Sequence, residues 1–455
     1  MPGKSPNILW IFGDQHRGQA LSILGDPNVQ TPNLDRLATE GIHFRRAVAT
    51  NPWCCPFRFS LTTGHYPHKG IDRTPPPAPL DPGLPTIATL LKKHGYHTSY
   101  IGKWHLHGKS KDGVGEKTMI VPPAHRGGFD SWIGYENNNS QYDTWVHGHR
   151  HDNTEVPLQR LPGYETDSLT DLFLDEIDRL GQNPDRPFFG VLSVQPPHTP
   201  NVAPPEDMAR HNPGTLQLRP NVPPVPRIEE LARRELAGYY AQIENLDRNV
   251  GRVLQRLRER DLLEDTLVVF FSDHGDCMGS HGYREKSSPW EESIRIPFII
   301  GGGVPYQNRR SGPVDAQISA VDILPTTLGL AGIETPADLP GFDYSGYVWR
   351  DQPIPLPGEP DSCYIQHTQY KRLHDGLNLP WRGVVTKDGW KYVCIPNAPF
   401  GMWNLNEDPY EMANLAFNQR FIHKRKELQA RLQKWIEDTG DAFDLPPLPP
   451  EKTPS

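Results

Sequence analysis

The chain has little cysteine, no long hydrophobic run and no excess of positive charge. Five cysteines among 455 residues are few and odd in number, which argues against a disulfide framework. Lys and Arg total 47 against 55 for Asp and Glu, a net charge of −8, which excludes the basic footprint of nucleic-acid binders. No segment approaches the ~18–20 apolar residues of a membrane span. The sequence therefore predicts neither a nucleic-acid nor a membrane partner.

The amino terminus also lacks the pattern of a secretion signal. The stretch MPGKSPNILWIFGDQ carries one lysine and a short apolar run that ends in Gly-Asp-Gln. A signal peptide has a longer apolar region followed by a cleavage site of small residues. We therefore expect a cytoplasmic protein.

Proline and glycine are plentiful instead, at 49 and 40 residues. A hydrophobic fraction of 36% is enough for a large core, which excludes a disordered chain. Many prolines gather in three stretches, Thr74–Pro85, Gly108–Pro123 and Pro196–Pro226. Long loops in compact domains are commonly functional, so we expect these stretches to stiffen the wall of a pocket.

Five short apolar runs are typical of strands that are buried on both faces: Asn7–Phe12, His97–Ile101, Pro187–Val194, Leu267–Phe271 and Ile296–Ile300. Helical patterns lie between them, at Leu84–His94, Thr166–Leu180 and Arg233–Arg260. This alternation predicts βαβ units, and therefore an α/β domain over residues 1–360 with a large, mixed, mostly parallel sheet flanked by helices.

The pattern changes from about residue 361. Short predicted strands at Trp381–Thr386, Trp390–Ile395 and Met402–Asn404 precede a predicted helix at Ile422–Asp438 and a proline-rich tail. We predict a smaller α+β subdomain over residues 361–455 that contains a short antiparallel sheet. Its terminal arm, Asp444–Ser455, could pack on a second copy, so a homo-oligomer stays open.

Four predicted strands are followed by chemically active side chains: Asp14 and Gln15, Lys103 and His105, His198, and Asp273 and His274. Because ligands bind beyond the carboxyl ends of parallel strands, we expect these side chains to share one crevice. Carboxylates with amide or imidazole neighbours favour a hard divalent cation, Ca²⁺ first and Mn²⁺ or Mg²⁺ as alternatives. A single Asp after a strand is commonly only a turn residue, and it is the joint placement that favours a site.

The segment after residue 50 is predicted to form a short helix, with Pro56 near its first position and Gly64 at its end. Cys54 would then lie just ahead of a helix N-terminus, where backbone N–H groups and the helix dipole favour an anion. Arg58, one turn later, can add a charge-assisted donor. The alternative is that Cys54 and Cys55 are buried and inert, as free cysteines commonly are.

Taken together, these motifs resemble the type I, formylglycine-dependent sulfatases of the alkaline phosphatase superfamily. Cys54-Cys-Pro-Phe-Arg58, continuing to Thr63-Gly64, resembles the signature C-x-P-x-R…TG of that family. Gly102-Lys-Trp-His105 resembles its G-K-W-H motif, and Ser272-Asp-His-Gly-Asp276 its second metal segment. Lys286 and the segment from Glu291 to Pro297 follow in the same order, so the resemblance covers nearly the whole chain.

The resemblance implies an alkaline-phosphatase-like fold and a reaction. A maturing enzyme would oxidise Cys54 to formylglycine, and a divalent metal would be held by residue 54 with Asp14, Gln15, Asp273 and His274. One hydroxyl of the formylglycine hydrate would then attack the sulfur of an aryl, small organic or carbohydrate sulfate ester. The implied catalytic set also contains residues that stabilise the sulfuryl oxygens (Arg58, Lys103, Lys286), protonate the leaving group (His198, with Lys286) and help to expel sulfate (His105).

The chain also departs from the common family pattern. Phe57 replaces a small residue, His65 replaces an arginine, and Gln15 and His274 stand where many members have Asp and Asn. These departures keep an alternative open, a phosphonate monoester or phosphodiester hydrolase on the same scaffold. The Lys103 and His105 pair favours sulfate, because that other branch tends to lack it. The histidines at 147, 149 and 151 are expected in a polar loop at the pocket rim.

Overall fold

The computed structural model describes residues 5–71, 79–108, 115–303, 309–368, 377 and 379–448. Parts of the predicted loops Thr74–Pro85 and Gly108–Pro123, and the last residues of the terminal arm, lie outside these ranges. Within them, no helix combines the length and the apolar composition needed to cross a membrane. All five cysteines are free and buried, in agreement with the expectation from the composition.

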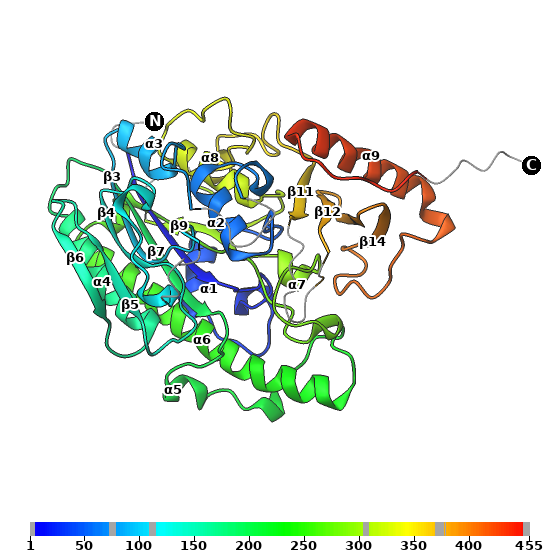
Figure 1. The fold of residues 1–455 in the computed structure, drawn as a ribbon, viewed down its shortest axis with the longest axis horizontal. Helices are drawn as coiled ribbons and strands as arrows, with labels where there is room; N and C mark the ends of the chain where they lie inside the picture. Colours follow the sequence, from blue (N-terminus) through cyan, green and yellow to red (C-terminus); the bar gives the residue numbers. More distant parts are fainter. Residues whose placement is uncertain are drawn as a thin grey trace, which may run out of the picture.

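A large mixed sheet forms the centre of the molecule (Figure 1). Its strand order is β10 (Gly312–Val314), β2 (Ile42–Phe44), β9 (Phe298–Gly302), β8 (Thr266–Ser272), β1 (Asn7–Asp14), β7 (Phe188–Pro197), β3 (His97–Lys103), β4 (Ser131–Tyr135), β5 (Trp145–His149) and β6 (Glu155–Arg160). The central strands β8, β1, β7, β3 and β4 are parallel to one another. The predicted α/β class is confirmed. The predicted strand near Ile296 corresponds to β9, which pairs antiparallel with β8.

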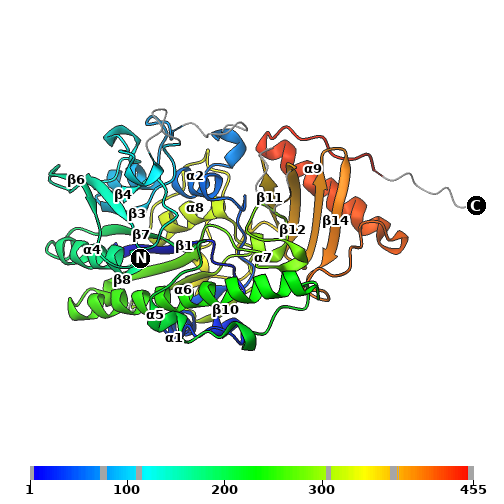
Figure 2. The ribbon, with the colours of Figure 1, turned by 60° about the horizontal axis from the view of Figure 1, so that its bottom comes forward.

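Helices cover both faces of this sheet, as Figure 2 shows. One face carries α2 (Cys54–Thr63), α3 (Ile87–Lys93) and α8 (Ala320–Leu330), and the other α1 (Pro32–Glu40), α4 (Glu165–Leu180) and α6 (Pro226–Glu259). The short α5 (Pro205–Met208) packs against α6, and α7 (Glu291–Ile294) precedes β9. Helix α6 begins seven residues before the predicted start at Arg233, because Pro226 fits the first helical turn.

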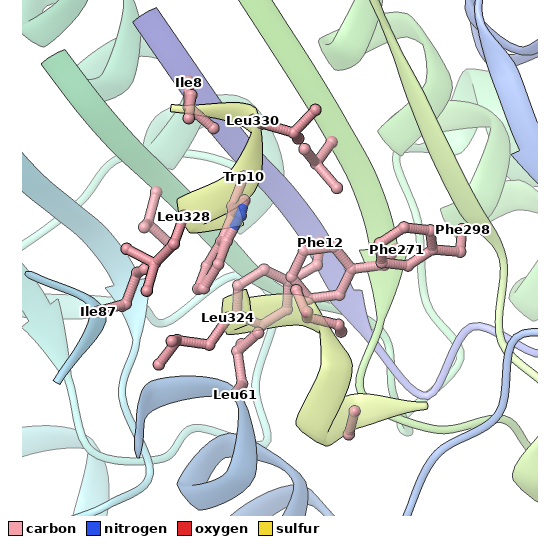
Figure 3. Close-up of a cluster of buried hydrophobic side chains, with 14 of the residues drawn as sticks. Ile8, Trp10, Phe12, Leu61, Ile87, Phe271, Phe298, Leu324, Leu328 and Leu330 are labelled. Carbon is pink, nitrogen blue, oxygen red and sulfur yellow. The ribbon is translucent and has the colours of Figure 1, made fainter. Parts of the chain in front are cut away.

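The period of two along β1 divides its side chains between the two layers. Ile8, Trp10 and Phe12 belong to one core cluster, and Leu9 and Ile11 to the other. Figure 3 shows Trp10 and Phe12 beside leucines of α8 and α2. The indole N–H of Trp10 donates to Thr327 Oγ1 at 3.1 Å, so its one polar atom is satisfied in the core. A strand buried on both faces needs an unbroken apolar run, which is why these strands could be read from the sequence.

A separate antiparallel sheet follows, in the order β11 (Ser362–His367), β12 (Trp381–Thr386), β13 (Trp390–Ile395) and β14 (Ala398–Asn404). Helix α9 (Ile422–Thr439) packs on it through Leu428, Leu432 and Ile436. Figures 1 and 2 show this unit beside the large sheet, on the side of the carboxyl terminus. The predicted small sheet and helix are confirmed. The boundary between residues 360 and 361 stays a prediction.

Candidate active site

Cys54 is the first residue of α2, and Trp53 before it caps the helix in an extended conformation. The prediction that Cys54 lies just ahead of the helix was wrong by two residues. The first-turn N–H groups of a helix have no partner within it, so Pro56 is tolerated in that turn. Gly64 ends the helix in the left-handed region, φ 76°, as its position in the sequence suggested. Every residue of α2 is buried, and the helix therefore places Cys54 firmly under the carboxyl edge of the sheet.

Four ligand atoms converge at this point, from Asp14, Cys54, Asp273 and His274, all within 4.8 Å of one another. Asp14 ends β1, while Asp273 and His274 follow β8, so two neighbouring parallel strands deliver three of them. Cys54 Sγ lies 3.2 Å from His274 Nε2 and 3.5 Å from Asp14 Oδ1. Four of the five predicted metal residues are therefore brought together in one fully buried cluster.

The donors of this cluster fit a divalent cation. His274 Nδ1 is 2.9 Å from the Gly275 carbonyl oxygen, which leaves Nε2 facing the two carboxylates and the sulfur. Burial lowers the pKa of His274, but Asp273 and Cys54 outweigh it and raise the pKa. The same converging negative field attracts a metal cation, and carboxylate oxygens are the ligands that Ca²⁺ prefers.

Gln15 adjoins the cluster in a strained conformation, with φ at 77°. Its N–H donates to Asp273 Oδ1 at 3.0 Å, and its amide Nε2 donates to Asp276 Oδ2. The amide oxygen is thereby turned toward Lys286, whose Nζ donates to it at 2.9 Å. Asp276 also accepts from the backbone N–H groups of Met278 and Glu285. Asp276 thus orients Gln15 and shapes the loop that leads to Lys286, a role that sequence reasoning missed.

Two buried cations lie beneath the cluster. Arg58 donates to the Lys103 carbonyl at 2.7 Å and to Ser193 Oγ at 2.9 Å, and its other guanidinium nitrogen lies 3.3 Å from Asp273. Lys103, at the end of β3, pairs with Asp14. Burial alone would raise the pKa of Asp14, but Lys103 above all holds it well below its ordinary value. The site thus keeps the Asp14 carboxylate ionised by placing positive charge beside it.

Lys286 and His198 form a second pair, above the sulfur. Lys286 Nζ lies 3.3 Å from Cys54 Sγ and 2.9 Å from His198 Nε2. His198 Nδ1 is 2.6 Å from the Thr199 carbonyl, so Nδ1 donates and Nε2 accepts from the lysine. Burial and Lys286 hold the pKa of His198 well below its ordinary value, whereas Cys54 and Asp14 raise the pKa of Lys286 against the effect of burial. The proton of this pair therefore rests on Lys286.

His105 lines the same cavity as Cys54, His198 and Lys286. Its backbone φ is 56°, a conformation that is uncommon for a residue other than glycine. Its Nδ1 is buried, and no hydrogen-bond partner for it exists in the described part of the chain. Burial, Lys103 and Arg58 lower the pKa of His105 well below its ordinary value. A neutral imidazole with a free ring nitrogen can accept a proton from a group bound in the pocket.

Glu136, directly after β4, supports the loop that follows His105, a role that sequence reasoning also missed. Its carboxyl group accepts the backbone N–H groups of His107 and Gly108, each at 2.9 Å. Burial raises the pKa of Glu136 to about 8, although these backbone bonds lower it. The missed signal was its position, because Glu136 is one more polar residue at the end of a parallel strand.

A cavity of about 740 Å³ opens on Cys54. It is lined by Trp53, Cys54, His105, Asn137, Asn139, His198, Thr199, Pro200, Asn201, Arg234, Glu235, Arg284, Glu285 and Lys286. Arg58 and Lys103 are not part of this lining, since they lie bonded below it. Apart from Trp53 and Pro200, the side chains of the outer wall are polar, and Pro200 brings the long proline-rich loop into the wall as expected.

The histidines after residue 146 do not reach this cavity, so the prediction of a loop at its rim was wrong. His147 and His149 belong to strand β5. His147 Nε2 accepts the N–H of Val121 at 2.8 Å, and His149 Nδ1 lies 2.9 Å from Arg126. Both imidazoles form structural hydrogen bonds at the edge of the sheet, and the spacing of the histidines in the sequence did not indicate these contacts.

A buried cysteine at a helix start, a cluster of metal-ligand type and surrounding cations lie together at the carboxyl edge of an α/β sheet, the arrangement that the resemblance to hydrolases of the alkaline phosphatase superfamily implies. The family model "Sulfatase" matches residues 6–333, and "N-sulphoglucosamine sulphohydrolase, C-terminal" matches residues 279–438. The chain belongs to the sulfatase family, and it is a sulfuric ester hydrolase.

Related proteins match this chain over nearly its full length. An ulvan-active sulfatase of Formosa agariphila is 34% identical over 449 residues, which cover 96% of this chain and 82% of that protein. A crystal structure named yidJ from Bacteroides fragilis, assigned to the sulfatases, has a TM-score of 0.84 at 28% identity and covers 97% of this chain and 98% of its own. The phosphonate monoester hydrolase of Agrobacterium radiobacter shares the fold at a TM-score of 0.73 and 22% identity, covering 95% of this chain and 96% of its own.

Proposed function

We propose that the chain hydrolyses the sulfate ester of a carbohydrate, with Cys54 converted to formylglycine and a divalent metal, Ca²⁺ first, held by Asp14, Gln15, residue 54, Asp273 and His274. The observation that carries the proposal is the convergence of Cys54 with two carboxylates, an imidazole and Lys286 on one buried point. The polar wall of the cavity supports a sugar over an aryl group. A carbohydrate substrate is also supported by two matches, to the sulphoglucosamine sulphohydrolase model and to the ulvan-active sulfatase.

The conversion of Cys54 requires a partner, a formylglycine-generating or sulfatase-maturing enzyme. Cys54 is 1% exposed, so such an enzyme would act before α2 is buried in the fold. The oxidised side chain would offer oxygen in place of sulfur, and oxygen is the harder and better ligand for Ca²⁺. The bound metal would lower the pKa of the hydroxyl on residue 54 and neutralise charge on the sulfate group.

The residues around Cys54 divide the remaining work. Arg58 and Lys103 compensate Asp14 and Asp273 from below and keep the site electrostatically ready for an anion. Lys286 holds the proton of its pair with His198 and would deliver it to the departing sugar oxygen, directly or through His198 Nε2. His105, neutral and with a free nitrogen, would accept a proton from residue 54 when sulfate is expelled.

Two measurements test this proposal. Peptide mass spectrometry of active protein should find the aldehyde at residue 54, and an unmodified thiol in fully active protein would refute the nucleophile. A paired assay with 4-nitrophenyl sulfate and a phenyl phosphonate ester tests the reaction class. We expect the sulfate to be turned over much faster, since Lys103 and His105 are both present. A preference for the phosphonate ester would establish the alternative.

A further inference from the structure

A second hollow adjoins the active-site cavity. It has a volume of about 430 Å³ and is lined by residues from the first turns of α6 and from the loop before Lys286. Arg234, Glu235 and Arg284 line both hollows. The two hollows are therefore neighbours, one opening on Cys54 and the other at the start of α6. We call the outer hollow the arginine groove, after Arg227, Arg234 and Arg284.

The arginine groove offers unused positive charge. Arg227 and Arg234 are exposed, and no ion pair or hydrogen bond of either side chain is formed within the described ranges. They are seven residues apart, so they share one face of α6 about 10 Å apart along its axis. Glu230, which lies between them on that face, is the one carboxylate on this stripe.

Arg284 is held differently. Its guanidinium makes a bidentate pair with Glu235, with Nε 3.0 Å from Oε2 and the second bond from Nη2 to Oε1. This pair consumes Glu235, which would otherwise neutralise its neighbour Arg234 on α6. The lining of the outer hollow thus holds three arginines and two carboxylates, Glu230 and Glu235, and Glu285 lines the active-site cavity. Among the described residues, Arg234 lies at the junction of the two hollows without a bonded carboxylate.

The chemistry of the wall identifies the ligand. A planar guanidinium binds carboxylate and sulfate groups through paired, charge-assisted hydrogen bonds. The groove also lacks aromatic side chains among its described lining residues. Such a surface suits an anionic group on a hydroxyl-rich chain better than an apolar leaving group.

Resting on the proposed function, we infer that the arginine groove binds a second anionic group, a carboxylate or another sulfate, of an extended sugar chain whose sulfate ester lies at Cys54. Arg234 is the principal specificity residue and Arg227 extends the contact. The substrate is then an anionic oligosaccharide rather than a single neutral sugar sulfate.

The test compares sulfated disaccharides that differ in one group on the second ring: a carboxylate, a second sulfate, or the carboxylate reduced to an alcohol. For the unaltered enzyme we expect kcat/KM to be roughly tenfold higher for the anionic forms, through KM, as one charge-assisted contact provides. R234A should reduce this ratio toward one, and R227A/R234A should complete the loss. The control R258A changes an exposed arginine on the far end of the same helix and should leave the ratio unchanged.

Comparing the carboxylated disaccharide with the disulfated one identifies the anion. A groove for carboxylates gives the higher kcat/KM with the carboxylated disaccharide, and a groove for sulfates gives it with the disulfated one. An equal kcat/KM for the anionic and reduced disaccharides in the unaltered enzyme would overturn the inference. If no sulfate ester were hydrolysed, the proposed function would fail on its own. Calorimetric binding of the carboxylated disaccharide without its ester sulfate would still test the groove. Weaker binding to R234A than to R258A would support it, and equal binding would overturn it.

Discussion

Lys391 on β13 offers the sharpest test of how the small sheet supports the active site. The side chain is fully buried, and its Nζ donates to the Pro289 carbonyl at 2.7 Å and to Glu291 at 3.1 Å. It also pairs with Glu411. Burial would lower the pKa of Lys391, but Glu411 and Glu291 raise it. One lysine of the small unit thus holds the segment that directly follows Lys286.

Replacing this lysine by methionine keeps its length and removes its charge. K391M leaves Glu291 and Glu411 buried without their cation, and the loss of one partner of a buried pair costs about 3–5 kcal/mol of unfolding free energy. K434M is the matched control, because Lys434 pairs with Asp438 at 2.7 Å while the two side chains are 74% and 54% exposed. An exposed i,i+4 pair contributes only about 0.3–0.5 kcal/mol.

Urea unfolding followed by the fluorescence of the 11 tryptophans measures both variants. We expect K391M to unfold at clearly lower urea than K434M, and K391M/E411L to recover part of the loss, because it removes one of the uncompensated charges. Activity should fall in K391M along with stability, since Lys286 loses its support. Equal midpoints for K391M and K434M would refute the assignment of the buried pair as a brace.

Three further outcomes follow from the site. Cys54→Ala should abolish turnover while Cys55→Ala retains it, because Cys55 packs in the core and burial raises the pKa of its thiol; equal loss in activity assays would mean that the nucleophile is misassigned. Glu136 has a pKa of about 8 in the fold against 4.5 when unfolded, so the folded state binds the extra proton between these values. Stability should therefore decline from pH 4.5 to 8, by up to about 1.4 kcal/mol per pH unit, and E136Q should flatten that decline in urea titrations at several pH values. Removal of metal by a chelator should stop turnover and lower the melting temperature, and added Ca²⁺ should restore both; a melting curve indifferent to chelator and Ca²⁺ would contradict the metal assignment.

The strands that carry the site could be predicted because burial on both faces leaves a continuous apolar signal. The outer strands could not. β2 spans only Ile42–Phe44, too short to show any period, and β6 is largely exposed, with the polar sequence EVPLQR. Their pairing is decided by neighbours far away in the chain, such as the contact of Ile42 with Ile300. Local pattern contains no information about such partners.

The candidate site shows the same contrast between features visible in the local sequence and contacts that only the folded chain makes. Its residue types and their positions after strands were visible, and the structure brings Asp14, Cys54, Asp273, His274 and Lys286 together. The partnerships inside it were not visible, since Lys286 reaches Gln15 across 271 residues of sequence. The bond from His198 Nδ1 to the carbonyl of the next residue, Thr199, is local, but the contact of His198 Nε2 with Lys286 spans 88 residues. Such details arise from tertiary geometry.

The small sheet completes the site from a distance. The N–H of Gln366 on β11 donates to the Thr50 carbonyl at 2.7 Å, four residues before Cys54. On β12, the indole N–H of Trp381 donates to the Ser287 carbonyl at 2.9 Å, next to Lys286. These two contacts and Lys391 hold both the nucleophile segment and the lysine loop. The proposed mechanism needs Lys286 within hydrogen-bond distance of Cys54 and His198. Under that proposal, the geometry of the reaction depends on residues after position 360 that contribute no group to the chemistry.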